Sequence, residues 1–151
     1  MSEDHPSGRL LGLDPGTRRI GVAVSDDLQW FARPLEVIRR SRKGLDQAVE
    51  RLGTLIEELE IVELVVGVPY RLDGSTSAST EMALGFIEVL SKTWPKLPIV
   101  ARDETLTSWE AEQILEERGI KGRGQRDLVD AFAAAVILQE LLDERRSSGS
   151  D

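Results

Sequence analysis

The order of apolar and polar positions predicts alternating strands and helices along most of the chain. Short apolar runs rich in β-branched residues, bounded by turn residues such as Pro15-Gly16, are typical of strands. Apolar residues at helical spacing predict amphipathic helices. The pattern predicts strands at 9–14, 20–25, 30–38, 61–68 and 97–101, and helices at 45–59, 78–93, from Thr107 or Ser108 to Gly119, and at 127–144.

The connections between these elements favour a five-stranded mixed sheet with helices on its faces. The first three strands follow one another through hairpins, and later strands are joined by helices, as in right-handed crossovers. Pro34 predicts an edge strand or a bulge for the third strand. The segment 131–138 is apolar on every side, which predicts that the last helix is buried. We therefore expect an α/β fold.

A chain of 151 residues is long enough for one domain. We expect a flexible leader at 1–8, the domain at 9–144 and a flexible tail at 145–151. The absence of cysteine and the presence of one histidine exclude disulfides, thiolate metal sites and most nucleophilic triads. The leader lacks the pattern of a signal peptide, and no apolar run is long enough to span a membrane. We expect a cytoplasmic protein without a membrane partner.

The net charge of −8 is unevenly distributed. Residues 14–43 carry seven basic and four acidic side chains, and residues 118–126 carry four basic side chains and no acid. Residues 44–91 carry nine acids against two bases. A basic rim on an acidic body suits a polyanionic partner such as nucleic acid, although each block alone could be ordinary solvated surface.

Five carboxylates fall at the ends of predicted elements. Asp14 ends the first strand, Asp103 and Glu104 follow the fifth, and Asp127 and Asp130 begin the last helix. Ligand sites in α/β sheets collect beyond the carboxyl ends of strands. Carboxylates gathered there, with no His or Cys nearby, favour hard divalent cations such as Mg²⁺ or Mn²⁺. Two such cations can clamp a phosphodiester during hydrolysis.

Each of these residues also has a plain structural explanation. The Asp14 segment could form a simple turn, and Asp103 and Glu104 could lie in an exposed loop. Asp127 is better explained as the N-cap of the last helix than as a ligand. Asp130 could complement the helix dipole. However, it shares a helix face with apolar residues, and an inward-pointing carboxylate favours a paired or metal-bound role.

Four sequence blocks resemble the RuvX/YqgF family of Holliday-junction-resolvase-like proteins. The blocks are LLGLDPGTRRIGVAVSD, VVGVPYRLDGS, DETLTSWEA and DLVDAFAAAVIL, in that order, between residues 9 and 142. The resemblance implies a ribonuclease H-like fold with a five-stranded mixed sheet in the order 3-2-1-4-5. It also implies a metal-dependent nuclease.

The resemblance assigns roles to particular residues. Asp14, Glu104 and Asp130 match the catalytic and metal-binding carboxylates of the family, which would hold Mg²⁺ or Mn²⁺, two per site. Asp103 and Asp127 are possible additional ligands. This chain has Thr105 where the family usually has arginine, and Arg102 or Arg126 could replace that arginine. The candidate nucleic-acid contacts are Thr17, Arg18, Arg19, Arg71, Arg102, Lys121, Arg123 and Arg126.

The resemblance leaves two nuclease functions open. The first hypothesis is a structure-specific endonuclease that resolves Holliday junctions or related branched DNA. The alternative is a nuclease that processes the 5′ end of the pre-16S rRNA. In both, a metal-activated water attacks in line and leaves a 5′-phosphate and a 3′-hydroxyl. Junction cleavage requires a symmetric homodimer, whereas rRNA trimming could proceed as a monomer.

Two non-nuclease functions remain as distant alternatives. The sequence L-G-x-D-x-G-T also resembles the phosphate-binding hairpin of actin, heat-shock chaperones and sugar kinases. Those proteins close a cleft between two domains, which one domain cannot do. A non-catalytic RNA-binding module is disfavoured because three Trp, three Phe and one Tyr offer no evident stacking platform.

Neutralising Lys121 and Arg123 should weaken nucleic-acid binding and flatten its dependence on salt, because fewer counterions would be released. Affinity measured against ionic strength checks this expectation. An unchanged slope would identify both residues as ordinary surface charge.

Overall fold

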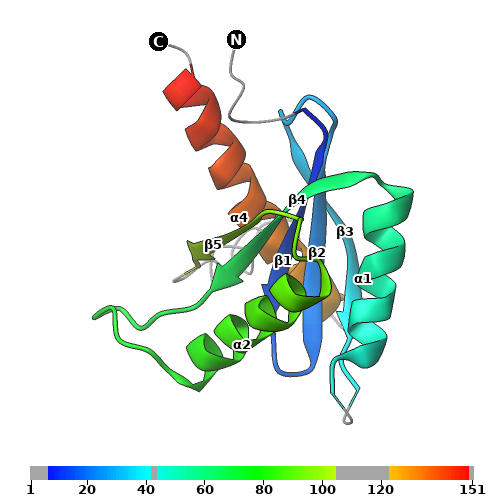
Figure 1. The fold of residues 1–151 in the computed structure, drawn as a ribbon. Helices are drawn as coiled ribbons and strands as arrows, with labels where there is room; N and C mark the ends of the chain where they lie inside the picture. The colour runs from blue at the N-terminus through cyan, green and yellow to red at the C-terminus, as the bar shows by residue number, and fades with distance from the viewer. Residues whose placement is uncertain (1–6, 42–43, 105–122, 150–151) are drawn as a thin grey trace.

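A computed structural model gives the fold and describes residues 7–41, 44–104 and 123–149, with side chains of the last segment described from Val129 (Figure 1). Five strands form one sheet in the order β3-β2-β1-β4-β5. The strands are β1 (Arg9–Pro15), β2 (Arg19–Ser25), β3 (Ala32–Arg39), β4 (Ile61–Val68) and β5 (Ile99–Asp103). The helices are α1 (Asp46–Glu58), α2 (Ala78–Thr93) and α4 (Arg123–Gly149). The predicted α/β fold and its strand order are confirmed.

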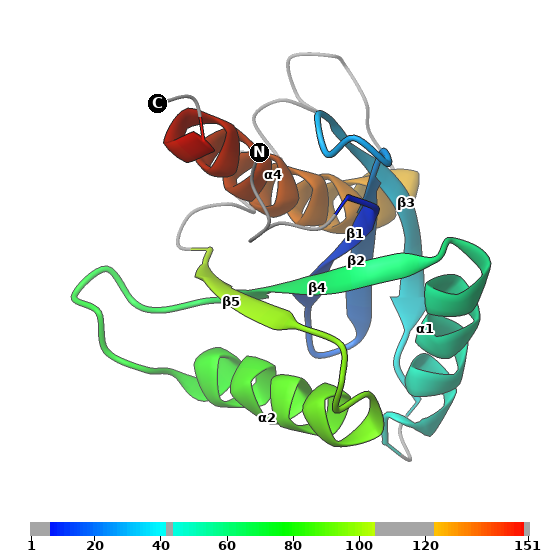
Figure 2. The same ribbon diagram turned by 45° about the horizontal axis from the view of Figure 1, so that its top comes forward.

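Helices cover both faces of the sheet. In Figure 2, α1 and α2 lie on one side of the strands and α4 crosses the other side. Leu52 of α1 and Phe86 of α2 belong to the core on the first face. Ala134 and Leu138 of α4 pack with buried strand residues such as Val65 on the second. The central strands are consequently buried on both faces, as their continuous apolar sequences predict.

Strand direction brings several chain segments to one end of the sheet. β1, β4 and β5 are parallel, and Leu13, Val66 and Ala101 lie side by side across them. The three strands therefore finish at the same end, where the β1–β2 hairpin also turns. We call this end of the sheet, together with the hairpin residues 16–18, the carboxyl edge.

Glycines in the central strands let α4 pack directly against the sheet. A Cβ atom on Gly21 of β2 would lie 1.9 Å from the backbone oxygen of Asp130. A Cβ atom on Gly12 of β1 would lie 3.0 Å from the backbone oxygen of Ala134. A side chain at either position would push α4 away from the sheet. The two glycines therefore allow the short distance between the helix and the sheet.

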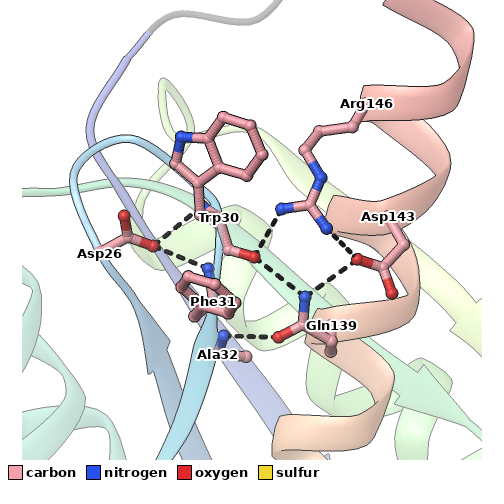
Figure 3. A network of polar contacts seen from close by, with 7 residues as sticks. All are labelled: Asp26, Trp30, Phe31, Ala32, Gln139, Asp143 and Arg146. Atoms are coloured by element: carbon pink, nitrogen blue, oxygen red, sulfur yellow. Dashed lines mark hydrogen bonds and ion pairs between the residues drawn. The ribbon is translucent and has the colours of Figure 1, made fainter.

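A polar network joins the β2–β3 loop to α4 (Figure 3). The Asp26 carboxylate accepts hydrogen bonds from the backbone N–H groups of Trp30 and Phe31 at 2.9 and 2.8 Å. On α4, the Gln139 side chain accepts from the Ala32 N–H at 2.8 Å and donates to the Trp30 carbonyl at 3.0 Å. The loop is thus held at both ends of its turn and at the start of β3.

The same loop exposes apolar side chains. Leu28, Trp30 and Phe31 are 74%, 50% and 71% exposed. The Arg146 guanidinium lies 4.7 Å from the centroid of the Trp30 ring, a cation–π contact.

Desolvation raises the pKa of Asp26, but the hydrogen bonds from the loop backbone outweigh it and lower this pKa below its usual value. The carboxylate therefore stays charged at neutral pH and accepts the hydrogen bonds that shape the loop.

Several predicted boundaries differ from the structure. β5 begins at Ile99 instead of 97, because the Leu97 N–H bonds to the Trp94 carbonyl in the turn after α2. β3 begins at Ala32 instead of 30, since the preceding residues belong to the loop capped by Asp26. Pro34 does accompany a register shift on the edge strand, as expected.

The last helix is longer than predicted at both ends. It begins at Arg123, so Asp127 lies inside the helix and the N-cap interpretation is wrong. Arg123, Gln125 and Arg126 are good helix formers, and the helix extends through this segment despite Gly124, which is a poor one. It continues to Gly149, where a flexible tail was expected, and the Arg145–Glu63 ion pair at 2.7 Å fixes this extension to β4. The predicted helix ending at Gly119 lies outside the described residues.

The described helices include none with the length and apolar character needed to cross a bilayer.

Gly21→Ala should destabilise the protein by about 1–3 kcal/mol, because its methyl group would collide with the α4 backbone. Thermal unfolding measures the loss, expected as a fall in Tm of about 2–10 °C. Gly85→Ala on α2 is the matched control, since nothing lies within 4 Å of its Cβ position. Equal Tm values for both variants would contradict the packing argument.

Candidate active site

Two acidic side chains meet at the carboxyl edge. Asp14, near the end of β1, is 8% exposed, and Glu104, directly after β5, is 7% exposed. The Glu104 N–H donates to the Val68 carbonyl at 3.2 Å, which continues the β4–β5 pairing by one residue. The two carboxyl groups hydrogen-bond to each other. The sequence hypothesis that the ends of strands one and five converge is therefore correct for this pair.

A glycine between the two strands makes the contact possible. A Cβ atom on Gly67 of β4 would lie 2.9 Å from Glu104 Oε2 and 2.5 Å from the Ile137 side chain. Any larger residue would therefore have to displace the carboxyl group or α4. Gly67 leaves the space in which Glu104 turns back over the sheet toward Asp14.

Burial favours a proton on the Asp14–Glu104 pair at neutral pH. Burial, the hydrogen bond to Asp14 and repulsion from Asp14 and Asp103 raise the pKa of Glu104 to about 10. Burial also raises the pKa of Asp14, and repulsion from Asp130 adds to this, while the hydrogen bond from Glu104 opposes it. At neutral pH Glu104 therefore keeps its proton and donates it in the hydrogen bond to Asp14.

One oxygen of this pair lacks a partner. Within the described part of the chain, Glu104 Oε2 is buried and accepts no hydrogen bond. An unsatisfied buried acceptor costs about 1–3 kcal/mol. A cation that prefers oxygen ligands would remove that cost if it were bound beside this atom.

Asp130 lies near the pair but is held by an arginine. Its carboxylate is 24% exposed and accepts a hydrogen bond from Arg19 Nε at 2.6 Å. The Gly21 position beneath it is directly opposite Asp14 across the β1–β2 pair. Asp130 is therefore close enough to influence Asp14 electrostatically, while its charge is balanced by Arg19.

The other candidate ligands are placed differently. Asp103 is exposed at the end of β5 and acts on Glu104 by charge repulsion. Asp127 lies in α4, and its side chain is outside the described residues, as are those of Arg123 and Arg126. Lys121 and Thr105 also fall outside the described residues.

Two predicted phosphate contacts are already engaged. Arg102 contacts Glu144 on α4 and lies 4.0 Å from Glu140, so its replacement of the family arginine would require breaking these pairs. Arg19 holds Asp130. Arg71, by contrast, is exposed in the loop after β4, and Thr17 and Arg18 are exposed in the β1–β2 hairpin.

The carboxyl pair suits a hard divalent cation. It supplies buried oxygen ligands, an unpaired acceptor and a proton that a bound cation would displace. Among the side chains described, however, no group of three or more His, Cys, Asp or Glu residues is arranged to hold a metal ion. Asp130 could complete such a group only by exchanging its contact with Arg19.

Comparison with known proteins identifies the family. The model described as "RuvX: Holliday junction resolvase" matches residues 8–144. The chain belongs to the RuvX family. A relative from Mycobacterium sp. (strain KMS) is 41% identical over 145 residues, which cover 96% of this chain and 85% of the relative. One from Mycobacteroides abscessus is 39% identical over 149 residues, covering 99% and 89%. Both are named "Putative pre-16S rRNA nuclease".

Solved structures support the ribonuclease H-like fold of this RuvX-family chain. RuvC of T. thermophilus, in complex with a Holliday junction substrate, matches with a TM-score of 0.56 and 20% identity, covering 93% of this chain and 97% of RuvC. The yeast mitochondrial Holliday junction resolvase Ydc2 matches with a TM-score of 0.52 and 14% identity, covering 97% and 85%. Family membership indicates a nuclease that hydrolyses phosphodiester bonds of nucleic acid.

Sequence reasoning missed the supporting residues of the site. Gly21 and Gly67 have no chemistry of their own, although each interrupts an apolar strand, which is a signal of close backbone approach. The Arg19–Asp130 pair joins residues 111 positions apart, and no local spacing indicates it.

The raised pKa of Glu104 predicts a pH-dependent stability. Between pH 4.5 and about 10, the folded protein retains a proton that the unfolded chain releases. In the metal-free protein, the free energy of unfolding should therefore fall as pH rises, by at most about 1.4 kcal/mol per pH unit. Glu104→Gln removes this proton and should flatten the profile.

Thermal unfolding in EDTA from about pH 5.5 to 9, inside the interval bounded by the two pKa values, measures the effect. The Tm of Glu104→Gln should rise relative to that of the wild type as pH increases. Glu88→Gln, at an exposed position of α2, provides the control and should follow the wild type. A Glu104→Gln profile parallel to that of the wild type would contradict the protonated pair.

Proposed function

We propose that this chain is a Mg²⁺- or Mn²⁺-dependent endonuclease that processes the 5′ end of the small-subunit rRNA precursor in the cytoplasm. The observation that carries the proposal is the buried Asp14–Glu104 pair with its unpaired oxygen, at the carboxyl edge of a RuvX-family sheet. The names of the curated relatives favour the RNA substrate over branched DNA.

Each residue has a defined task in the proposed site. Asp14 and Glu104 would hold the cations, with Asp130 as a third ligand, and two cations are expected per site. The bound cations would supply charge neutralisation and nucleophile activation for in-line attack on a phosphodiester. A cation held by Glu104 would displace the proton of this carboxyl group, so cation affinity would rise with pH. Arg19 orients Asp130 beside the pair and balances its charge before binding.

Holliday junction cleavage is the second candidate function. The family description names it, and RuvC bound to a junction shares this fold. A junction presents two symmetric strands, so this function needs a homodimer with two sites. The solution mass of the protein with and without a four-way junction distinguishes a dimeric resolvase from a monomeric RNA nuclease.

Asp14→Asn, Glu104→Gln and Asp130→Asn should each reduce cleavage on the order of 100-fold or more, because each removes a negative charge that would hold the cation, and the cation in turn would stabilise the substrate's developing charge. The assay offers a pre-16S rRNA fragment, a four-way DNA junction and plain duplex side by side in Mg²⁺ and Mn²⁺. Glu88→Gln should cleave like the wild type.

Thermal unfolding of each variant confirms that loss of cleavage is not loss of folding. Retained cleavage in one variant would remove that residue from the site. Cleavage of the junction in preference to the rRNA fragment would overturn the proposed substrate. Cleavage that continues in EDTA at the same rate in the wild type and in all variants would overturn the metal mechanism.

A further inference from the structure

A cavity with three arginines lies beside the proposed active site. It has a volume of about 380 Å³ and is lined by Thr17, Arg18, Arg39, Arg40 and Ser41. Among the described residues, the lining combines three guanidinium groups with two hydroxyl groups and includes no acid. This composition suits a phosphate group, because guanidinium forks match phosphate oxygens and hydroxyls add hydrogen bonds.

The cavity is held in place by the hairpin at the carboxyl edge. Arg40 Nη1 donates to the Gly16 carbonyl at 2.8 Å and contacts Met82 Sδ at 3.0 Å. The Arg40 backbone N–H donates to the Arg18 carbonyl at 2.8 Å. Both side-chain contacts use one nitrogen of the guanidinium, so its position is fixed before any ligand binds.

Arg18 supplies a positive charge that no side chain in the described part of the chain neutralises. Its side chain is exposed and forms no hydrogen bond or ion pair with the residues that the structure describes. Arg19 and Arg102 differ in this respect, because carboxylates on α4 engage both. Arg18 therefore brings to the cavity a positive charge that a ligand can use.

Strand register places the cavity close to the carboxyl pair. Asp14 of β1 lies opposite Gly21 of β2, which lies opposite Val37 of β3. Arg39 is two residues farther along β3, toward the carboxyl edge. With strands about 4.8 Å apart and residues rising about 3.3 Å, the Cα atoms of Asp14 and Arg39 lie about 12 Å apart. A nucleic-acid strand spans this distance within a few nucleotides, so a phosphate in the cavity and a bond cleaved at the carboxyl pair can belong to one strand.

We infer that this cavity binds a backbone phosphate of the nucleic-acid substrate within a few nucleotides of the cleaved bond. The inference rests on the proposed nuclease function and adds Arg39, Arg40 and Ser41 to the predicted contacts Thr17 and Arg18. The site recognises the phosphodiester backbone, so it sets the register of the strand relative to the carboxylates without selecting bases.

The test uses the double variant Arg18→Gln/Arg39→Gln, which removes two charges and leaves the anchored Arg40 intact. Binding is measured in the cleavage-inactive Asp14→Asn background, with a labelled pre-16S rRNA fragment in one arm and a four-way DNA junction in the other. The double variant should bind each nucleic acid about tenfold more weakly. The slope of log affinity against log salt concentration should become shallower by about 1 to 2.

Arg33→Gln is the matched control. Arg33 is an exposed arginine on the same strand, about 20 Å from Arg39 and at the opposite end of the sheet. The Asp14→Asn protein without further changes is the parent protein. Arg33→Gln in this background should keep the nucleic-acid affinity and the salt slope of the parent protein. Thermal unfolding of all variants verifies their folding.

A substrate modification locates the phosphate itself. Neutral methylphosphonates are placed one at a time along the strand of the better-bound substrate. A replacement at one position within a few nucleotides of the cleaved bond should weaken binding to the parent protein and leave binding to the double variant nearly unchanged. Equal sensitivity of both proteins at every position would overturn the inference.

The two proposals fail in different ways. If the parent binds neither nucleic acid, the nuclease proposal and the cavity inference both fall. If the wild type cleaves and the parent binds, but the double variant behaves like Arg33→Gln, only the cavity inference falls. Weaker binding of one arm alone assigns the cavity to RNA or to DNA.

Discussion

The buried hydrogen bond between Asp14 and Glu104 is the constraint on which the rest of the site depends. Burial raises the pKa of both carboxyl groups, and the pair accommodates their proximity by retaining a proton. A stability-driven design would replace one of them with an apolar residue. The retained acidic pair is instead suited to a ligand that brings its own positive charge.

The position of α4 connects this pair to the third carboxylate. Glycines in three adjacent strands let the helix backbone and the Glu104 side chain occupy the space above the sheet. Farther along the helix, Gln139 and Arg145 attach it to β3 and β4. Asp130 is therefore presented by an element fixed along its length, and Arg19 restrains its side chain before any ligand arrives.

Much of the architecture could be predicted from the sequence because apolar periodicity directly reflects burial. The strands that contain Asp14 and precede Glu104 were recognisable, and parallel order then brought their ends together. The ends of the helices were less predictable. Aspartate is a common N-cap residue, which favoured a helix start at Asp127, but the residues upstream of it are also helical. Pairings such as Arg19 with Asp130, and the Arg18–Arg39–Arg40 cavity, depend on tertiary register, which no local pattern encodes.

The irregularity at Pro34 has a consequence for assembly. β3 ends the sheet, and an unprotected outer strand invites the backbone of a second molecule to add to it. Proline offers no N–H group at that border, the register shift opposite it disturbs the regular spacing of donors, and Arg33 and Glu36 flank it with charge. The molecule is thereby guarded against polymerising through sheet extension along this side.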